Sequence, residues 1–407
     1  MQISSLDLSR QGYTKLPTEK IDFNVNWLIL SNNKIKYIDE NIIKYKSLTR
    51  LAINDNRLEI IHKNIGHCTT INWIDLTRNK LSTLPLEFGN LVKITGLGLS
   101  ENNFDHMPEA IFKLVNLRKF GFFSNKITWI SKDIKLLKNL VKIDLSNNKI
   151  EEIPDELTSL TSLSWLNLSN NKIKKIPDSI NNLINLEELG LGMNEIEEVP
   201  SIYNLNKLRI FPIYKNKIKK IHPAIYKLHK IEKLDFSDNQ ILEFPHEVFF
   251  NTSLKFLNLR NNKIHTIDHR ILTSINSTNI SILDISLNML QTIPYKLLSI
   301  FKDTATIRIE ENPFIKKKTI LPVNHTLMEI CLTKILKMDL HRPIDSWLKN
   351  IHQKILVCDV CKKKFVTEPI LIYLENTLDS NVQFIVEKTL CSSLCLKNTS
   401  MENDISN

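Results

Sequence analysis

One polar residue recurs through most of this chain at a nearly constant interval. Thirteen asparagines close a phrase that reads approximately L-x-x-L-x-L-x-x-N, and most successive intervals between them are 23 residues. They are Asn33, Asn56, Asn79, Asn102, Asn125, Asn148, Asn171, Asn194, Asn216, Asn239, Asn262, Asn288 and Asn312. A fixed period of roughly 20 to 50 residues predicts a stacked array of repeats rather than one globular core.

Each repeat predicts a short strand followed by a return segment. With the first Leu of the phrase as position 1, apolar residues at positions 4 and 6 alternate with mostly polar ones, as at Ile143 and Leu145. This alternation indicates a strand with one buried face. Residues 178–184 then have helical apolar spacing and return the chain to the next strand. No repeat buries its own apolar residues, so stacking must bury them.

The phrase resembles the intracellular, 23-residue form of the leucine-rich repeat (LRR) family, which carries Leu-Pro or Ile-Pro after the turn. Leu163, Leu166, Leu168, Asn171 and Pro177 of the eighth repeat illustrate the match, which covers fourteen repeats over about residues 1–314. The resemblance implies an α/β solenoid, a horseshoe of about 14 repeats with a parallel sheet on its concave face. It also implies a ladder of asparagine side chains bonded to turn backbone groups that would otherwise be unsatisfied.

Departures from the phrase locate special points in the array. The first repeat has Gln11 in place of Asn, and the last ends Asn312-Pro313-Phe314, so both ends resemble terminal caps. Pro212 falls inside the predicted strand of the tenth repeat, where it cannot donate to the sheet, and we expect a local kink there. Three extra residues fall within 268–279 and predict a protruding loop.

Large aromatic side chains occupy positions 3 and 7, which point away from the core onto the concave sheet. Such aromatic residues are the usual anchors of protein interfaces, so we predict that they bind a protein partner. The alternative is that each packs only against its neighbours on the sheet. Glycines at position 5 leave shallow spaces near the middle of the array. The predicted partner-binding residues are Trp27, Trp73, Phe123, Trp165, Tyr214 and Phe256.

The net charge of +10 raises nucleic acid or an acidic membrane as partners. However, positions 2, 3, 5, 7 and 8 together hold 13 acidic and 12 basic residues, so the concave face is about neutral. This balance argues against a nucleic-acid partner. The surplus lies partly in a row just after the ladder asparagines, which favours a solvated edge. Its members are Lys34, Lys80, Lys126, Lys149, Lys172, Lys217 and Lys263.

Bulk features predict an intracellular, cytoplasmic protein that is monomeric on its own. The N-terminal residues do not resemble a signal peptide, and no stretch approaches the ~20 apolar residues that span a bilayer. Four of the six cysteines fall in the last fifty residues, which argues against a disulfide-capped secreted array. No phosphate loop or Ser/His/Asp set stands out from the repeat frame. We therefore expect a non-enzymatic scaffold or adaptor, possibly acting in intracellular signalling.

The tail beyond the array carries two close cysteine pairs: Cys358 with Cys361, and Cys391 with Cys395. In an intracellular chain this spacing predicts a structural zinc site with four thiolate ligands, in a domain over residues 351–398 ahead of a disordered end at 399–407. The alternative is four reduced thiols. The tail also resembles that of animal LRR proteins of the leucine-rich repeat-containing protein 58 type.

A second motif lies between the array and the cysteines, in the segment 315–350. Residues 326–335 resemble the elongin-C-binding box of ubiquitin-ligase substrate receptors, with Leu327, Cys331 and Ile335 on one stripe of a helix. The resemblance implies elongin C and a cullin as partners, and a substrate receptor as the alternative function. The competing interpretation is that this helix caps the open end of the solenoid.

Overall fold

The computed structural model describes residues 4–268, 272, 275–302 and 304–314, and the backbone of short strands within 356–357, 364–365, 370–377 and 383–390. The chain divides into two compact units, Met1–Gln240 (unit 1) and Ile241–Asn407 (unit 2). This division falls inside the segment predicted as one solenoid. The boundaries predicted at residues 314, 350 and 398 stay predictions.

The main sheet has fourteen parallel strands in chain order, one from each repeat, which confirms the predicted LRR solenoid. Each strand covers positions 3 to 5 of its phrase. In unit 1 they are β1 (Ser5–Asp7), β2 (Trp27–Ile29), β4 (Arg50–Ala52), β6 (Trp73–Asp75), β7 (Gly96–Gly98), β8 (Lys119–Gly121), β9 (Lys142–Asp144), β10 (Trp165–Asn167), β11 (Glu188–Gly190), β12 (Ile210–Pro212) and β13 (Lys233–Asp235). In unit 2 they are β14 (Phe256–Asn258), β15 (Ile282–Asp284) and β17 (Thr306–Arg308).

Most return segments of unit 1 form short helices, which confirms the helical spacing read from the sequence, whereas the described segment between β11 and β12 contains turns but no helix. They are η1 (Thr18–Lys20), η2 (Glu40–Lys44), η3 (Lys63–His67), η4 (Leu86–Asn90), η5 (Glu109–Lys113), η6 (Lys132–Leu136), α1 (Asp155–Thr158), η7 (Asp178–Asn182) and η8 (Pro223–Lys227). All except α1 are 3₁₀ helices, since a few residues must span the width of one repeat. A small parallel pair, β3 (Tyr37–Ile38) and β5 (Ile60–Ile61), lies between the sheet and these helices in sequence.

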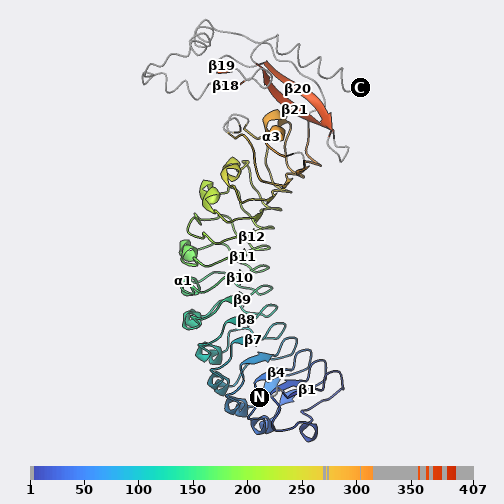
Figure 1. Ribbon diagram of the computed structural model, residues 1–407, viewed down its shortest axis with the longest axis vertical. Coiled ribbons are helices and arrows are strands. Elements are labelled where there is room, and N and C mark those ends of the chain that lie inside the picture. Colours follow the sequence, from blue (N-terminus) through green and yellow to red (C-terminus); the bar gives the residue numbers. More distant parts are fainter. Residues whose placement is uncertain are drawn as a thin grey trace. The chain divides into compact units, whose positions relative to one another are not determined.

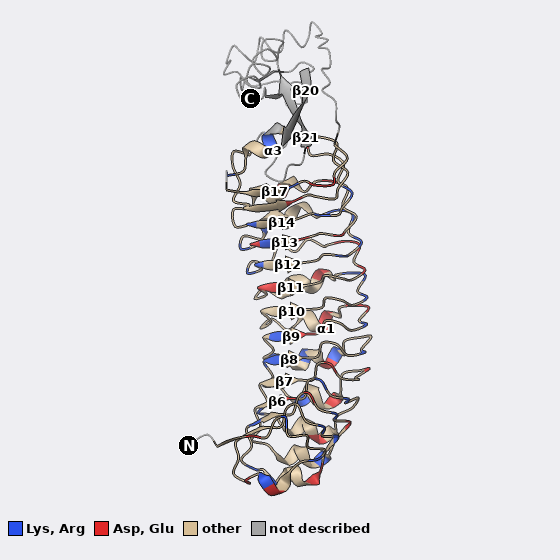
Figure 2. Cartoon of the chain, turned by 90° about the vertical axis from the view of Figure 1, so that its right-hand side faces the viewer, with Lys and Arg blue, Asp and Glu red and all other residues tan. Residues whose placement is uncertain are grey.

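In Figure 1 most helices of unit 1 lie along the left margin of the array, and Figure 2, which views the right-hand side of Figure 1, shows the strands toward the viewer. The core lies between these two layers. Its side chains come from positions 1, 4 and 6, such as Leu163, Leu166 and Leu168, all of which are fully buried. Because each repeat contributes the same few apolar positions, the core is continuous along the stack rather than centred on one cluster.

The asparagine ladder is present as the resemblance implied. In the fifth repeat, Asn102 Oδ1 accepts the Leu81 N–H at 2.9 Å, and Nδ2 donates to the Leu76 and Leu99 carbonyls at 3.0 and 3.1 Å. Each ladder side chain therefore joins the turn of its own repeat to that of the repeat before it. The residue preceding each ladder asparagine has a left-handed backbone, with φ between 51° and 58°, which this tight turn requires.

Unit 2 combines the last strands of the array with part of the tail. It contains η9 (His246–Phe250), β16 (Ile293–Pro294) and α3 (Tyr295–Ser299). In the tail, β18 (Leu356–Val357) pairs with β19 (Lys364–Phe365), and β20 (Ile370–Thr377) is antiparallel to β21 (Gln383–Leu390). β21 also pairs in parallel with β16, so a tail strand adds to the region of the last repeats.

Within unit 1, the strand pairing of the sheet is weakest next to β12, the strand that contains Pro212. Neighbouring strands pair at three positions in most of unit 1, but β11 and β12 register only through Glu188 and Ile210. Pro212 has no N–H to continue the ladder, so the weakened pairing follows from its ring, while the bend itself stays a prediction. Residues 269–271 and 273–274 of the predicted protruding loop lie outside the described residues.

Candidate functional site

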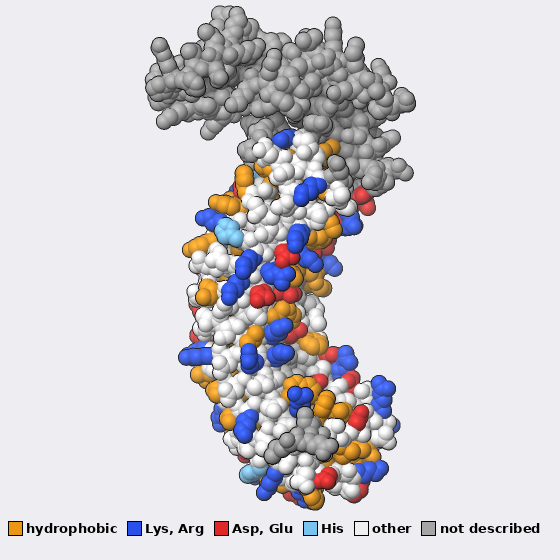
Figure 3. Space-filling view, viewed as in Figure 1, with side chains coloured by type: hydrophobic (Ala, Val, Ile, Leu, Met, Phe, Trp, Pro, Cys, Tyr) orange, Lys and Arg blue, Asp and Glu red, His pale blue; other side chains and the backbone are white. Residues whose placement is uncertain are grey.

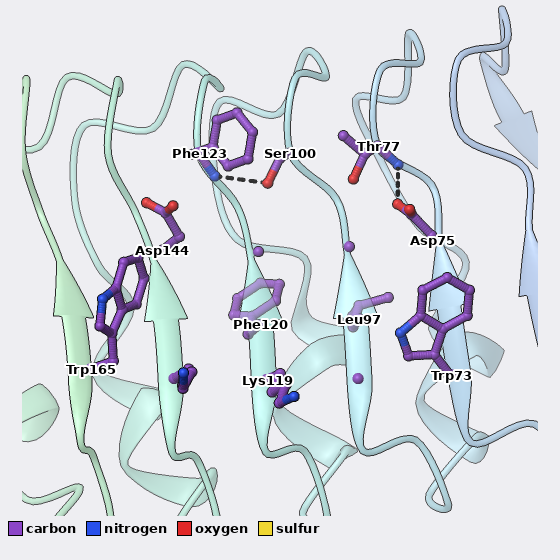
Figure 4. A pocket seen from close by; sticks show the side chains of 14 residues that line it. Trp73, Asp75, Thr77, Leu97, Ser100, Lys119, Phe120, Phe123, Asp144 and Trp165 are labelled. Carbon is purple, nitrogen blue, oxygen red and sulfur yellow. Dashed lines mark hydrogen bonds between the residues drawn. The ribbon is translucent and has the colours of Figure 1, made fainter. Parts of the chain in front are cut away.

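A hollow of about 430 Å³ opens on the sheet face of unit 1, over strands β6 to β10. We call it the central hollow. Trp73 of β6 and Trp165 of β10 stand at its two ends, as Figure 4 shows. Four strand steps separate them, which corresponds to roughly 19 Å at the usual strand spacing. Both indoles are half-buried, so each keeps an open face.

Two glycines lie in the floor of the central hollow, Gly98 and Gly121, at position 5 of β7 and β8. The space beside Gly98 is occupied, because an added Cβ would lie 2.6 Å from Asp75 Oδ1 and 2.9 Å from Thr77 Oγ1. A Cβ added at Gly121 would lie 3.1 Å from Ser100 Oγ and no closer than 4.0 Å to any other neighbour. The space above Gly121 is therefore open and can receive another backbone.

Trp73 reaches its position because the next strand has glycine at position 3. A Cβ added at Gly96 would lie only 2.6 Å from Trp73 Cδ1, so the indole lies directly over that glycine. Tyr214 lies over Gly192 in the same way, where an added Cβ would come within 2.6 Å of its ring. The alternative interpretation of the aromatic residues, packing on sheet neighbours, is thus correct in part for these two.

Charged groups line both margins of the central hollow. Lys119 and Lys142 stand at position 3 of β8 and β9, in line with the two indoles. Asp75 and Asp144 stand one row further along the strands, at position 5. Phe123 closes the third row, where its backbone N–H donates to Ser100 Oγ at 3.2 Å (Figure 4).

A second hollow of about 250 Å³ is lined by Trp27, Arg50, Asn72, Trp73 and Thr95. Trp73 lines both hollows, so they adjoin across its indole. The Arg50 guanidinium lies over the Trp27 ring, with its carbon 5.5 Å from the ring centre, a cation–π arrangement. The second hollow therefore repeats the combination of indole and cation that lines the central one.

The structure brings together some of the predicted partner-binding residues and not others. Trp73, Phe123 and Trp165 share the central hollow, and Trp27 lines the second one. Tyr214 lines neither hollow, and Phe256 lies on β14 in unit 2. All six aromatic side chains are half-buried rather than exposed.

The sequence reading missed Lys119, Lys142 and the covering of Gly96 by Trp73. The available signal was the row at position 3, where lysines and a glycine stand between two tryptophans. The adaptor motif residues Leu327, Cys331 and Ile335 and the cysteines Cys358, Cys361, Cys391 and Cys395 lie outside the described residues. The adaptor and zinc hypotheses therefore stay predictions.

The lysine row after the ladder asparagines is exposed at all seven positions, as expected for a solvated edge. Lys217 Nζ lies 2.8 Å from Glu195 Oε2, and this hydrogen bond lowers the pKa of Glu195. Lys126 Nζ donates to Asn103 Oδ1 at 2.8 Å. On the face drawn in Figure 3, basic side chains are scattered among acidic and uncharged ones.

Within the ranges that the structure describes, no group of His, Cys, Asp and Glu side chains is arranged to hold a metal ion. No helix in those ranges is both long and apolar enough to span a bilayer.

Comparison with known proteins agrees with the repeat geometry. An LRR protein of Leptospira interrogans, LIC12759, is 25% identical over 77% of this chain and 92% of its own, with a TM-score of 0.68. An internalin of Listeria monocytogenes is 23% identical over 77% of this chain and 88% of its own, with a TM-score of 0.66, and shows the fold alone. No curated protein sequence matches the chain.

A family profile described as a leucine-rich repeat region matches residues 109–320, which is more than half of the chain. The match ends before the cysteine pairs, so the resemblance of the tail to leucine-rich repeat-containing protein 58 stays a prediction. The ladder begins at Asn33, well before the matched region, and continues through it to Asn312 with the same hydrogen bonds. The chain therefore belongs to the leucine-rich repeat family.

Proposed function

We propose that this chain is a non-enzymatic scaffold or adaptor that binds a protein partner on the sheet face of unit 1, at the central hollow. One observation carries the proposal: two half-buried indoles face a floor of glycine backbone large enough for several partner side chains. Aromatic anchors beside an open, close-approach surface are the usual composition of an interface hot spot.

The free energy available from burying the two indoles is adequate for specific binding. If a partner removes about 100 Å² of each indole from water, the two contribute about 5 kcal/mol at about 25 cal/mol per Å². The open strand surface at Gly121 allows close packing with a partner's backbone. No side chain has to be displaced there, which keeps the cost of binding low. Interfaces of this kind usually depend on a few such residues, and the flanking contacts mainly exclude water.

The test compares affinity purifications from cells that express the full chain and its variants. Trp73→Ala/Trp165→Ala removes both anchors, and Gly121→Leu fills the floor where an added side chain meets little resistance. Trp129→Ala is the matched control, because Trp129 is 53% exposed and lines neither hollow.

We expect a partner that is recovered with the wild type and the control but at least tenfold less with the other two variants. Circular dichroism should show that all variants are folded. Equal recovery of every partner by all four proteins would overturn the proposal.

The substrate-receptor alternative is favoured by the stripe of Leu327, Cys331 and Ile335. It is tested by comparing the full chain with Leu327→Ala/Cys331→Ala. Selective loss of elongin C and a cullin from the purified complexes supports it, and their absence from both samples counts against it. We also propose that the chain acts in the cytoplasm, in intracellular signalling. Fractionation of the source cells would check the cytoplasmic location.

A further inference from the structure

Charges on the sheet face are segregated by row, although the whole face is about neutral. From β2 to β10, position 3 reads Trp27, Arg50, Trp73, Gly96, Lys119, Lys142 and Trp165. This row, which we call the basic strip, contains three cations, three indoles and no acid. The acids of the same strands stand at position 5, one row further on, roughly 7 Å away along the strand.

The acidic row is already engaged by the fold. Asp75 Oδ1 accepts the Thr77 N–H at 3.0 Å, as drawn in Figure 4. Asp144 Oδ1 accepts both the N–H and the hydroxyl of Ser146, at 3.0 and 2.7 Å. These carboxylates hold the turn that follows each strand, so their positions are set by the fold.

The cations of the basic strip, in contrast, have no acidic partner among the residues placed by the structure. Arg50, Lys119 and Lys142 are exposed, and none makes an ion pair with a residue that the structure describes. Other cations of unit 1 are paired: Arg78 Nε lies 2.9 Å from Glu101, and Arg209 Nε lies 2.8 Å from Glu232. Figure 2 shows the basic residues at β8 and β9 side by side on the sheet.

One polar group of the strip is also unsatisfied. The Trp27 indole N–H is buried and has no hydrogen-bond acceptor. Trp27 and Arg50 both line the second hollow. The N–H itself has no surface open to a ligand, but an anionic group bound in the second hollow would neutralise the adjacent guanidinium.

We infer that the partner contributes an extended acidic segment that crosses strands β2 to β10 along the basic strip. Its carboxylates lie on Arg50, Lys119 and Lys142, and its apolar side chains pack on Trp73 between these cations and on Trp27 and Trp165 at the two ends of the strip. Six strand steps span roughly 29 Å, the length of about nine extended residues. This inference deepens the proposed function and rests on it.

A peptide fits the strip better than a nucleic acid does. A phosphate backbone carries a charge at every nucleotide and would bring some of these charges close to Asp75 and Asp144. A peptide can place its neutral backbone over Gly121 and direct carboxylates only toward the cations. The glycine floor therefore favours the peptide.

The test uses fluorescence anisotropy with three fluorescein-labelled probes: a ten-residue peptide in which pairs of glutamates alternate with pairs of leucines, so that each face of the extended chain carries both kinds of side chain; its counterpart with lysine in place of glutamate; and a ten-nucleotide oligouridine. Each is titrated with the full chain, with Lys119→Glu/Lys142→Glu, and with the control Lys80→Glu/Lys149→Glu. The control makes the same charge change at two exposed lysines of the solvated edge.

We expect saturable binding of the acidic peptide, weakened at least tenfold by the strip variant and less than twofold by the control. No saturable binding of the acidic peptide, or equal loss with both variants, would overturn the inference. Tighter binding of oligouridine than of the acidic peptide would also overturn it, in favour of nucleic acid. A cellular partner lost with Trp73→Ala/Trp165→Ala but retained with the strip variant would leave the proposed function standing and refute the acidic segment alone.

Discussion

Removing one rung of the asparagine ladder should destabilise unit 1 far more than removing the asparagine next to it. Asn102 is 7% exposed, and its side chain bonds to the Leu81 N–H and to the carbonyls of Leu76, Leu99 and Ser100. In contrast, the Asn103 side chain only accepts a hydrogen bond from Lys126 at the surface. Asn102→Ala and Asn103→Ala are therefore a matched pair: the same substitution at adjacent positions, the first in the buried ladder and the second outside it.

The loss of free energy in Asn102→Ala depends on which of these backbone groups keep another hydrogen-bond partner. The Leu76 carbonyl still accepts from Asn79 Nδ2 at 3.0 Å, and the Leu99 carbonyl still accepts from Asn125 Nδ2 at 3.1 Å. The Leu81 N–H has no replacement in the described structure, and Leu81 is fully buried. A stranded donor costs about 1–3 kcal/mol and the lost bonds to carbonyls somewhat less each, so we expect about 3 kcal/mol in total.

The assay is urea unfolding of both variants, followed by circular dichroism and by hydrogen exchange at Leu81. A loss of about 3 kcal/mol corresponds to a melting temperature lower by about 6–12 °C for a unit of this size. Asn103→Ala should change the free energy of unfolding by less than about 0.5 kcal/mol, as surface changes usually do. Equal effects of the two changes would refute the reasoning, because they would mean that water replaces the ladder bonds. Asn102→Asp should be worse than Asn102→Ala, since it would place a buried carboxylate against the three carbonyl oxygens that the amide now donates to.

Three further outcomes are expected. Burial raises the pKa of the Cys68 thiol to about 11 from an ordinary 9.0. The stability contributed by the buried neutral thiol is therefore complete below pH 9.0 and is lost as the pH rises toward 11. The urea midpoint should fall more between pH 8 and 10.5 in the wild type than in Cys68→Ala. Met193 holds a left-handed φ of 57°, which is costly for most L-residues and is tolerated better by asparagine. Met193→Asn should therefore raise the free energy of unfolding by about 0.5–1 kcal/mol, and a lower urea midpoint would contradict this. The full chain purified without chelator should contain one zinc ion by mass spectrometry, and Cys358→Ser/Cys391→Ser should contain none. A zinc content near zero in the wild type would refute the predicted four-cysteine site.

The central hollow was predictable only in part. The register of the repeats placed Trp73 and Trp165 on the sheet face and Gly98 and Gly121 between them, and the structure confirms all four positions. The sequence did not indicate that Trp73 would lie over Gly96. That contact depends on a rotamer, which is chosen by the space that the neighbouring strand leaves.

The charge of the site could not be judged from a count of acidic and basic residues. Arg78 and Lys119 are equally basic in sequence, but Arg78 lies between Asp55 and Glu101, while Lys119 has no acidic partner within the described part of the chain. Asp144 counts as an acid of the sheet face, although its carboxylate is bonded to Ser146. Availability of a charge is a property of contacts, which a count of residues omits.

The sequence by itself determined the repeat frame: the strands at positions 3 to 5, the apolar core and the asparagine ladder. Each follows from a pattern confined to one repeat and copied along the chain, so local backbone geometry is enough to specify it. Only the tertiary structure decided which side chains of that frame form a site. Trp73 and Trp165 are 92 residues apart and share one hollow because stacking places their strands four steps from each other. The shape and free charge of that hollow arise between repeats, where each side chain occupies the space that its neighbour leaves.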